Sequence, residues 1–101
     1  AAKHGVVGLT RAVALELAST DITVNSICPG FTETPLLERS VENIIAKTGM
    51  SADAAYQSLR AGNPQKRFIQ TDEVAAMTVW LCSDGARSVT GQALSLSGGE
   101  I

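Results

Sequence analysis

The amino-acid sequence predicts an α/β fold that is helix-rich and contains two strands. Helical and strand-like patterns alternate along the 101 residues, and helices separate the two strand-like segments. Strands joined through helices favour parallel pairing with a right-handed crossover. Parallel sheets are normally covered on both faces and contain more than two strands. We therefore expect the two strands to belong to a larger sheet than these residues supply.

The first segment, residues 3–18, is predicted to be a helix. Its apolar residues fill more than one stripe of a helix with 3.6 residues per turn. They are Val6, Val7, Leu9, Val13, Ala14, Leu15 and Leu17. Because only a narrow polar strip remains, we expect a sheet on one side of this helix and another helix or subunit on the other.

The next segment, residues 22–28, is predicted to be a strand. It is rich in β-branched residues and ends at Pro29-Gly30. Residues 31–37 follow as a predicted loop, because a proline disfavours helical backbone at the residue before it. The strand therefore leads directly into a turn.

The middle third predicts two short helices, residues 41–47 and 52–61, with Ser40 and Ser51 as their N-caps. A glycine follows each helix, as is typical of helix ends. Both helices carry few large apolar residues. We therefore expect a weakly packed, mobile flap in this region.

The last third predicts one helix and one strand. Thr71 is predicted to cap the helix, and two acids follow it in the first turn. The expected inner face of this helix consists of Val74, Met77, Thr78 and Leu81. Residues 93–96 alternate between apolar and polar side chains, which predicts a short strand running into Gly98-Gly99.

Composition excludes several classes of function. Lys and Arg number 8 against 10 Asp and Glu, a formal charge of -2 that argues against a nucleic-acid-binding face. The apolar stretches are far shorter than the roughly 20 residues that cross a bilayer, and no secretory signal is visible. Cys28 and Cys82 are expected to be reduced and buried, with no metal site. We therefore expect a cytoplasmic protein without membrane or nucleic-acid partners.

Two places along the chain are candidates for chemistry. The turn from Pro29 to Thr34 follows a predicted parallel strand, where α/β proteins bind their ligands. Gly30 would allow close backbone approach, and threonines supply hydroxyls, although strand-Pro-Gly is also a common way to end a strand. Lys3 near the start of the first helix is either a functional cation or a solvated charge. No Gly-rich phosphate-binding motif occurs.

Taken together, six stretches of the sequence resemble the short-chain dehydrogenase/reductase family in the order that the family has them. They are similar to its active-site helix, the next strand with its Pro-Gly loop, its final helix, the turn into the final strand and the closing segment. The stretches are residues 1–11, 14–18, 22–30, 72–75, 89–92 and 96–99. The resemblance covers essentially the whole chain. It implies one partial domain over residues 1–101, the C-terminal part of a Rossmann-like doubly wound parallel sheet.

The resemblance implies a catalytic role for Lys3. The family uses a Tyr-x-x-x-Lys pair on this helix, and Lys3 falls where the lysine belongs, so the tyrosine would precede Ala1. The family's catalytic serine and Gly-rich nucleotide loop would precede it too. The implied reaction is hydride transfer between the nicotinamide and a carbonyl or carbinol carbon. Lys3 would lower the pKa of the tyrosine and hold the ribose hydroxyls of the nicotinamide.

The resemblance also implies the cofactor, NAD or NADP in the complete enzyme. Four residues of the Pro-Gly loop would orient its carboxamide and pyrophosphate. They are Pro29, Gly30, Thr32 and Thr34. Two positions depart from the family pattern: Thr32 stands where a branched aliphatic residue is frequent, and Ser97 stands where an acid is common.

Residues 36–68 correspond to the family's variable substrate lid. The candidate residues to meet substrate are the apolar Leu36, Leu37, Tyr56 and Phe68 and the polar Gln65, Lys66 and Arg67. Packing in the core is at least as good an interpretation for Phe68 and Leu36. The sequence looks closest to the branch containing 3-oxoacyl-ACP reductases and 3-hydroxybutyrate dehydrogenases, so a small hydroxy or oxo compound is the expected substrate.

Two functional hypotheses remain open at this point. The first is a portion of an NAD(P)-dependent oxidoreductase that interconverts an alcohol and a ketone. Under this hypothesis the 101 residues alone are inactive and bind no cofactor tightly. The alternative is a non-enzymatic oligomerising or interaction module derived from the same family. Both predict a homo-oligomer, because the first helix and residues 93–96 expose surfaces suited to self-association.

Overall fold

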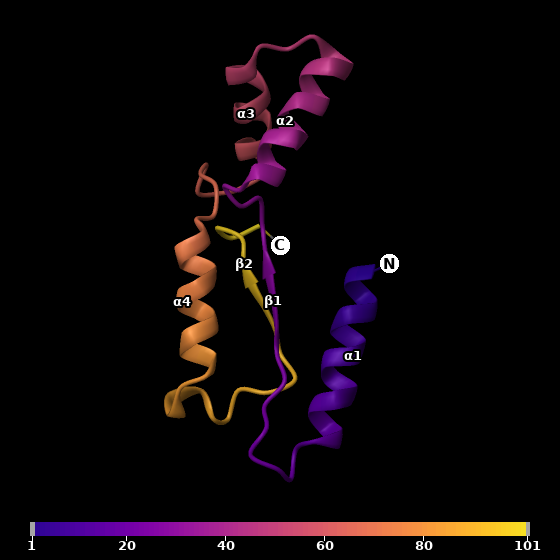
Figure 1. The fold of residues 1–101 in the computed structure, drawn as a ribbon, viewed down its shortest axis with the longest axis vertical. Coiled ribbons are helices and arrows are strands. Elements are labelled where there is room, and N and C mark those ends of the chain that lie inside the picture. Colours follow the sequence, from indigo (N-terminus) through magenta and orange to yellow (C-terminus); the bar gives the residue numbers. More distant parts are fainter. Residues whose placement is uncertain (1, 101) are drawn as a thin grey trace. The chain divides into compact units, whose positions relative to one another are not determined.

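The structure, a computed structural model, describes residues 2–100. Figure 1 shows the order of their secondary-structure elements. The elements are α1 (Ala2–Glu16), β1 (Ser26–Pro29), α2 (Pro35–Thr48), α3 (Ala52–Ala61), α4 (Thr71–Leu81), the short 3-10 helix η1 (Asp84–Ala86) and β2 (Ala93–Leu96). The predicted order of helix, strand, helices, helix and strand is confirmed. No helix among these residues is both long and apolar enough to cross a membrane.

The two strands pair in parallel, as predicted. The backbone N–H of Ser26 donates to the carbonyl of Gln92 at 2.9 Å, and that of Gly30 donates to Leu96 at 3.0 Å. Donors and acceptors advance along the chain in the same direction, and Figure 1 shows β1 and β2 as adjacent arrows pointing the same way. The carboxyl ends of both strands therefore lie at the same edge.

Strand β1 is shorter than the predicted segment, residues 22–28. Its early part bonds to a loop and not to a strand: the N–H of Val24 donates to the Thr90 hydroxyl at 3.1 Å, and Gly91 donates back to the Val24 carbonyl at 2.7 Å. Gly91 has a φ of +72°, which L side chains rarely adopt. The turn at Gly91 thus replaces ladder pairing at the start of the predicted strand.

The chain divides into two compact units. The first contains the chain up to Cys28 together with Ala75–Ser95, and the second contains Pro29–Val74 together with the chain from Leu96. In the first unit, the described residues bury little of α1: Thr10 and Ala14 are buried, whereas Leu15 is 80% exposed. The two-sided cover expected for this helix is therefore not present within residues 2–100.

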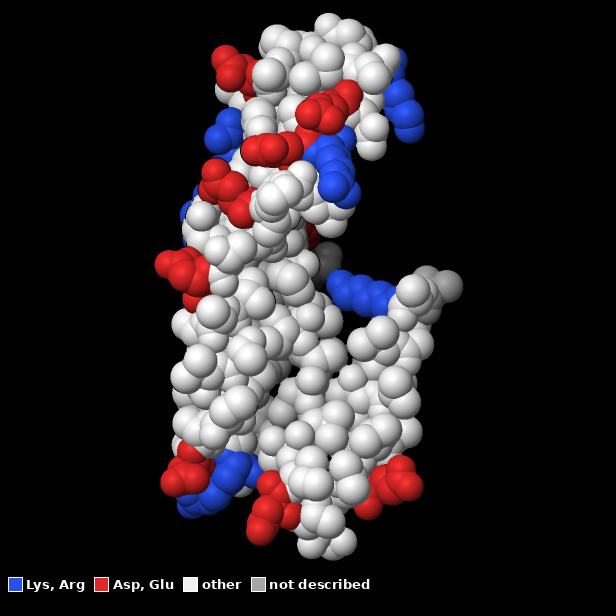
Figure 2. Space-filling model, viewed as in Figure 1, with Lys and Arg blue, Asp and Glu red and all other residues white. Residues whose placement is uncertain are grey.

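Helix α4 begins in the second unit and continues into the first, and its side chains are more exposed than predicted. None of its residues is fully buried, but three of the four residues of the expected inner face, Val74, Met77 and Leu81, are half-buried, whereas Thr78 is exposed. Val79 is 71% exposed. Cys82, which follows the helix, is exposed and not buried as expected, while both cysteines are free. In Figure 2 the surface over α4 beyond its first turn carries no charge.

In the second unit, one of the two middle helices begins earlier than predicted and the other has the predicted bounds. Helix α2 begins at Pro35, inside the predicted loop, because proline is favourable in the first turn of a helix. Ser40 is therefore not an N-cap; its hydroxyl donates to the Leu36 carbonyl at 3.3 Å within the helix. Ser51 does cap α3, accepting from the N–H of Ala54 at 3.2 Å, and the predicted bounds of α3 are confirmed.

The expectation of a weak core in the second unit is wrong. Its buried apolar residues come from α2, α3 and the segment after α3: Leu37, Val41, Ala55, Phe68 and Ile69. The Phe68 ring makes an edge contact with Tyr56, with 6.1 Å between centroids, and the Arg60 guanidinium lies 5.5 Å from the Phe68 centroid. The segment after α3 thus supplies the large side chains that the two helices lack.

Asn25 links the two halves of the first unit through its side chain. Its Nδ2 donates to the Val89 carbonyl at 2.9 Å, and its Oδ1 accepts from the N–H of Gln92 at 3.1 Å. Both partners lie in the segment before β2. The single side chain therefore holds the approach to β1 against the approach to β2.

Replacing this side chain tests that link. We expect Asn25→Ala to lower the free energy of unfolding by about 1–3 kcal/mol, because two backbone groups lose their partner. Urea denaturation of the purified protein measures the effect. Asn43→Ala, at an exposed position of α2, is the matched control and should change stability by less than about 0.5 kcal/mol. Equal effects of the two substitutions would contradict the assigned role.

Candidate functional site

The structure places the predicted site residues in two different units. Lys3 lies in the first turn of α1, in the first unit, and its side chain is exposed. Pro29 ends β1, and Gly30, Thr32 and Thr34 follow it in the second unit. That Lys3 and the loop act on the same cofactor stays a prediction.

Gly30 is the point of closest backbone approach in the loop after β1. A Cβ at this position would lie 3.4 Å from Cα of Ser97 and 3.5 Å from its Cβ, which is van der Waals contact. The N–H of Gly30 is already bonded to Leu96. The loop after β1 therefore lies directly against the loop after β2.

The threonine hydroxyls of this loop bond to carbonyls within the loop and do not cap α2. Thr32 Oγ1 donates to the Gly30 carbonyl at 3.0 Å, and Thr34 Oγ1 donates to the Thr32 carbonyl at 3.4 Å. Thr34 occupies the N-cap position, yet its side chain makes no capping hydrogen bond. The N–H of Leu37 instead donates to the Thr34 carbonyl at 2.9 Å, and no side-chain oxygen of Thr34 lies on the positive end of the α2 dipole, which favours an anion.

A short stretch after α3 holds the loop in place. Thr32 and Ile69 form an isolated parallel bridge. The N–H of Ile69 donates to the Phe31 carbonyl at 2.9 Å, and the N–H of Glu33 donates to the Ile69 carbonyl at 2.9 Å. Ile69 is almost completely buried. The conformation of the loop is thus fixed from a distant part of the sequence.

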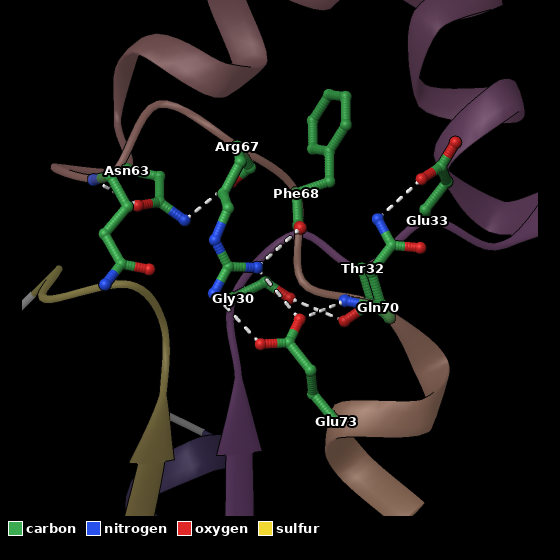
Figure 3. Close-up of polar contacts among 9 residues, drawn as sticks. Gly30, Thr32, Glu33, Asn63, Arg67, Phe68, Gln70 and Glu73 are labelled. Carbon is green, nitrogen blue, oxygen red and sulfur yellow. Dashed lines mark hydrogen bonds and ion pairs between the residues drawn. The ribbon is translucent and has the colours of Figure 1, made fainter.

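An ion pair anchors the same stretch to α4. Figure 3 shows the Arg67 guanidinium facing the Glu73 carboxylate, with two N–O distances of 3.0 Å. Glu73 also accepts the N–H of Gln70 at 2.7 Å, which caps the start of α4. The hydrogen bond from Arg67 and then that from Gln70 lower the pKa of Glu73 to about 2. Glu73 in turn raises the pKa of Arg67.

A final hydrogen bond connects this anchor to the loop. Gln70 Nε2 donates to Glu33 Oε2 at 2.7 Å. Sequence reasoning treated Arg67 as a substrate residue and missed its pairing. The acid at the third position of α4 was the available signal, because such an acid reaches back to the start of its helix. Thr71 is accordingly the first residue of α4 and not its cap.

The predicted lid residues differ in accessibility. Leu37 and Phe68 are buried, with 4% and 7% of their surface exposed, so they pack within the second unit. Tyr56 is half-buried beside Phe68. Leu36 is 67% exposed and is the apolar lid residue that is free to meet a ligand. Within residues 2–100, no group of three or more His, Cys, Asp or Glu side chains is placed to hold a metal.

Sequence reasoning also missed Asn63, a buried polar residue between α3 and Phe68. Its amide bonds to two backbone groups of the turn that follows it: the amide oxygen accepts from the N–H of Gln65, and the amide nitrogen donates to the Arg67 carbonyl. An asparagine followed by proline was the only signal, and it indicates no more than a turn.

Comparison with known proteins gives consistent results over nearly the whole chain. The sequence profile of a family described as "Enoyl-(Acyl carrier protein) reductase" matches residues 1–100. A granaticin polyketide synthase putative ketoacyl reductase from Streptomyces violaceoruber is 48% identical over 98% of this chain and 36% of its own length. A D-beta-hydroxybutyrate dehydrogenase from Rhizobium meliloti is 41% identical over 98% of this chain and 39% of its own length.

Solved structures agree with these relatives. A short chain dehydrogenase family protein from Francisella tularensis has a TM-score of 0.91 at 31% identity, over 97% of this chain and 40% of that one. An actinorhodin polyketide ketoreductase crystallised with NADPH has a TM-score of 0.88 at 45% identity, over 96% of this chain and 37% of that one. The chain thus spans less than half the length of the proteins it matches, and the predicted Rossmann-like fold class is confirmed.

The lowered pKa of Glu73 predicts a pH dependence of stability. Above the ordinary carboxyl pKa of 4.5, Glu73 is ionised in the folded and unfolded protein, and the pair with Arg67 contributes fully. As the pH falls from 4.5 towards 2, the unfolded protein takes up this proton first, so the contribution shrinks and is lost. The stability difference between the wild type and Glu73→Gln should therefore be largest above about pH 5 and disappear near the folded-state pKa.

Denaturation at a series of pH values, at constant ionic strength, measures this difference. Asp72→Asn is the matched control, because Asp72 is an exposed acid in the same helical turn and forms no ion pair among the described residues. A difference for Glu73→Gln that does not change with pH would contradict the role assigned to the pair.

Proposed function

The chain belongs to the short-chain dehydrogenase/reductase family, and we propose that it forms the part of an NAD(P)-dependent oxidoreductase that carries the catalytic lysine, the nicotinamide-binding loop and the substrate lid. The enzyme interconverts an alcohol and a ketone. A 3-oxoacyl or 3-hydroxyacyl compound, including 3-hydroxybutyrate, is the proposed substrate class. The names of the ketoacyl reductase and D-beta-hydroxybutyrate dehydrogenase relatives support this choice. Two free cysteines support a reducing, cytoplasmic location.

The observation that carries the proposal is the loop after β1. It follows the carboxyl end of a parallel strand, and it leads into the N-terminus of α2, where the Thr34 side chain makes no capping hydrogen bond. The positive end of a helix dipole and the hydroxyls of Thr32 and Thr34 have the chemistry that a pyrophosphate and a carboxamide require. The residues present therefore fit a nicotinamide dinucleotide.

The bound nicotinamide supplies or accepts the hydride. In the proposed mechanism, the Lys3 ammonium donates hydrogen bonds to the ribose hydroxyls. Its positive charge lowers the pKa of the catalytic tyrosine, which exchanges a proton with the substrate oxygen. Pro29 and Gly30 shape the loop, and Thr32 and Thr34 orient the carboxamide and the pyrophosphate. Each residue thus acts by binding, orienting or tuning a proton.

Helices α2 and α3 form the proposed substrate lid. The exposed Leu36 supplies apolar contact at the base of α2, and Tyr56 supplies a half-buried ring on α3. Leu37 and Phe68 support these residues from within the packed second unit. An apolar lid excludes water from the reacting carbon and favours an acyl chain.

Removing the charge of Lys3 tests the catalytic assignment. We expect Lys3→Met, in the complete enzyme that contains this chain, to lower kcat/KM by about 100-fold or more. The limb of the pH profile that reports the tyrosine should also move to higher pH, because the lost cation no longer favours the phenolate. Steady-state kinetics across pH with NADPH and NADH measures both effects.

Arg11→Met is the control for this substitution. Arg11 is another exposed cation on α1, and no hydrogen bond or ion pair is assigned to it among the described residues. The control should keep kcat/KM and the pH profile of the wild type. A Lys3→Met enzyme with the same profile as Arg11→Met would exclude Lys3 from catalysis.

A second candidate function is a non-enzymatic oligomerising module, and the exposed apolar side chains of α1 and α4 favour it. Leu9 and Leu15 on α1 and Val79 and Trp80 on α4 are all substantially exposed. Apolar side chains on two helices are typical of surfaces that bind other protein. Self-association is therefore proposed under both functions.

The 101-residue chain on its own tests two expectations that both candidate functions share. We expect it to show no NADPH- or NADH-dependent turnover and no tightly bound cofactor, because it contains neither a Tyr-x-x-x-Lys tyrosine nor a Gly-rich nucleotide loop. We also expect it to sediment as an oligomer. Absorbance at the nicotinamide band and analytical ultracentrifugation measure these properties. Turnover above buffer, or a well-folded monomer, would each contradict the expectation.

A further inference from the structure

Asn63 is a buried polar residue whose side chain closes the turn after α3. Only 7% of its surface is exposed. Its Nδ2 donates to the Arg67 carbonyl at 2.7 Å, and its Oδ1 accepts from the N–H of Gln65 at 2.7 Å. Figure 3 shows both contacts from the same side chain. The amide thus spans the turn and leaves little freedom in its orientation.

The loop after β2 packs against this amide at a glycine. Gly98 has a φ of +65°, and a Cβ there would overlap the Oδ1, Nδ2 and Cγ atoms of Asn63. Next to it, a Cβ on Gly99 would lie 3.6 Å from the ring of Pro64. The turn after α3 and the loop after β2 therefore meet without room for a side chain at Gly98.

The same loop also meets the proposed nicotinamide-binding loop. Ser97 lies against Gly30, and Leu96 accepts the N–H of Gly30. The Ser97 hydroxyl donates to the Glu100 carbonyl at 2.8 Å, which bends the chain after β2. Residues 96–98 thus contact Gly30 through one part and Asn63 through the next.

We propose that Asn63 is a positioning residue for the cofactor: by filling the space against Gly98, its amide fixes the loop after β2 and, through Ser97, the place of Gly30. Asn63 itself does not touch the cofactor. The inference rests on the proposed function, because it takes the loop after β1 as the nicotinamide-binding loop. Under this inference, the turn after α3 contributes to cofactor affinity.

An asparagine fits this position better than its close relatives. A leucine of similar size would leave the N–H of Gln65 and the carbonyl of Arg67 without their partner. An aspartate would place a carboxylate oxygen against the Arg67 carbonyl, where Nδ2 now donates. A serine would keep an acceptor for the turn but would vacate the space against Gly98. Substitution with serine therefore separates closing the turn from filling the space.

The first experiment measures cofactor affinity in the complete enzyme by fluorescence titration with NADPH, and with NADH as a second probe. Asn63→Ala should raise the dissociation constant by about five-fold, with kcat changed by less than about two-fold. Ser88→Ala, at an exposed position outside the lid, should leave both unchanged. A lower Tm for Asn63→Ala with an unchanged dissociation constant would overturn the inference, because the role would then be structural only. If Asn63→Ala does not fold, Asn63→Ser is subject to the same comparison.

The second experiment tests the path through Gly98. Gly98→Ala should weaken cofactor binding and lower Tm, because its Cβ meets the Asn63 amide. Asn63→Ala removes that obstacle, so the double variant should bind NADPH more tightly than the product of the two single effects predicts. Gly85→Ala is the control, since its nearest neighbour is Ser83 Oγ at 3.8 Å, and it should combine additively with Asn63→Ala. Additivity of Asn63→Ala with Gly98→Ala would overturn the inference.

The outcomes also separate this inference from the proposed function. A wild-type enzyme that binds neither NADPH nor NADH would overturn both together. A wild-type enzyme that binds either cofactor, with Asn63→Ala binding it equally well, would overturn the inference alone. Weaker binding by Asn63→Ala together with non-additive coupling to Gly98→Ala would support both.

Discussion

The parallel pairing of β1 with β2 is the constraint on which the rest of the second unit depends. Because both strands run in the same direction, their carboxyl ends open at one edge, and the loops that follow them lie side by side. Gly30 and Ser97 lie in van der Waals contact there. An antiparallel arrangement would place the loop after β2 at the opposite end of β1. The contact between Gly30 and Ser97 would then be lost.

Local signals in the sequence predicted the elements whose ends are determined by neighbouring residues. Helix α3 is the clearest case, because the Ser51 hydroxyl caps it and both of its predicted bounds are confirmed. The start of α2 was missed because Thr34-Pro35 fits two structures: the proline restricts Thr34 to extended backbone, and it also suits the first turn of a helix. Both hold in the structure, where Thr34 is extended and Pro35 is the first residue of the helix, so the proline marks a helix start and does not extend the loop beyond it.

Only those residues of the candidate site that belong to a family motif were predictable from the sequence. Lys3 and the Pro-Gly loop came from the resemblance, while Asn63 and the pairing of Arg67 with Glu73 did not. Both missed features depend on residues that the fold brings together: Asn63 packs against Gly98, and Arg67 pairs with Glu73 in the first turn of α4. An asparagine or an arginine in a polar turn has no distinguishing pattern of its own. Contacts between separate segments, and not local propensity, therefore determine the environment of Asn63 and of Arg67.

The two ends of the segment that contains α2 and α3 are joined to each other. The chain enters α2 just after Thr32 and leaves the region at Ile69, and these two residues are bridged in parallel. The side chains of Glu33 and Gln70 extend the same junction by a hydrogen bond of 2.7 Å. The Glu73 carboxylate accepts from Arg67 and from the N–H of Gln70, so the same junction extends to the first turn of α4. The loop after β1, the segment after α3 and the start of α4 are therefore held by one continuous set of contacts.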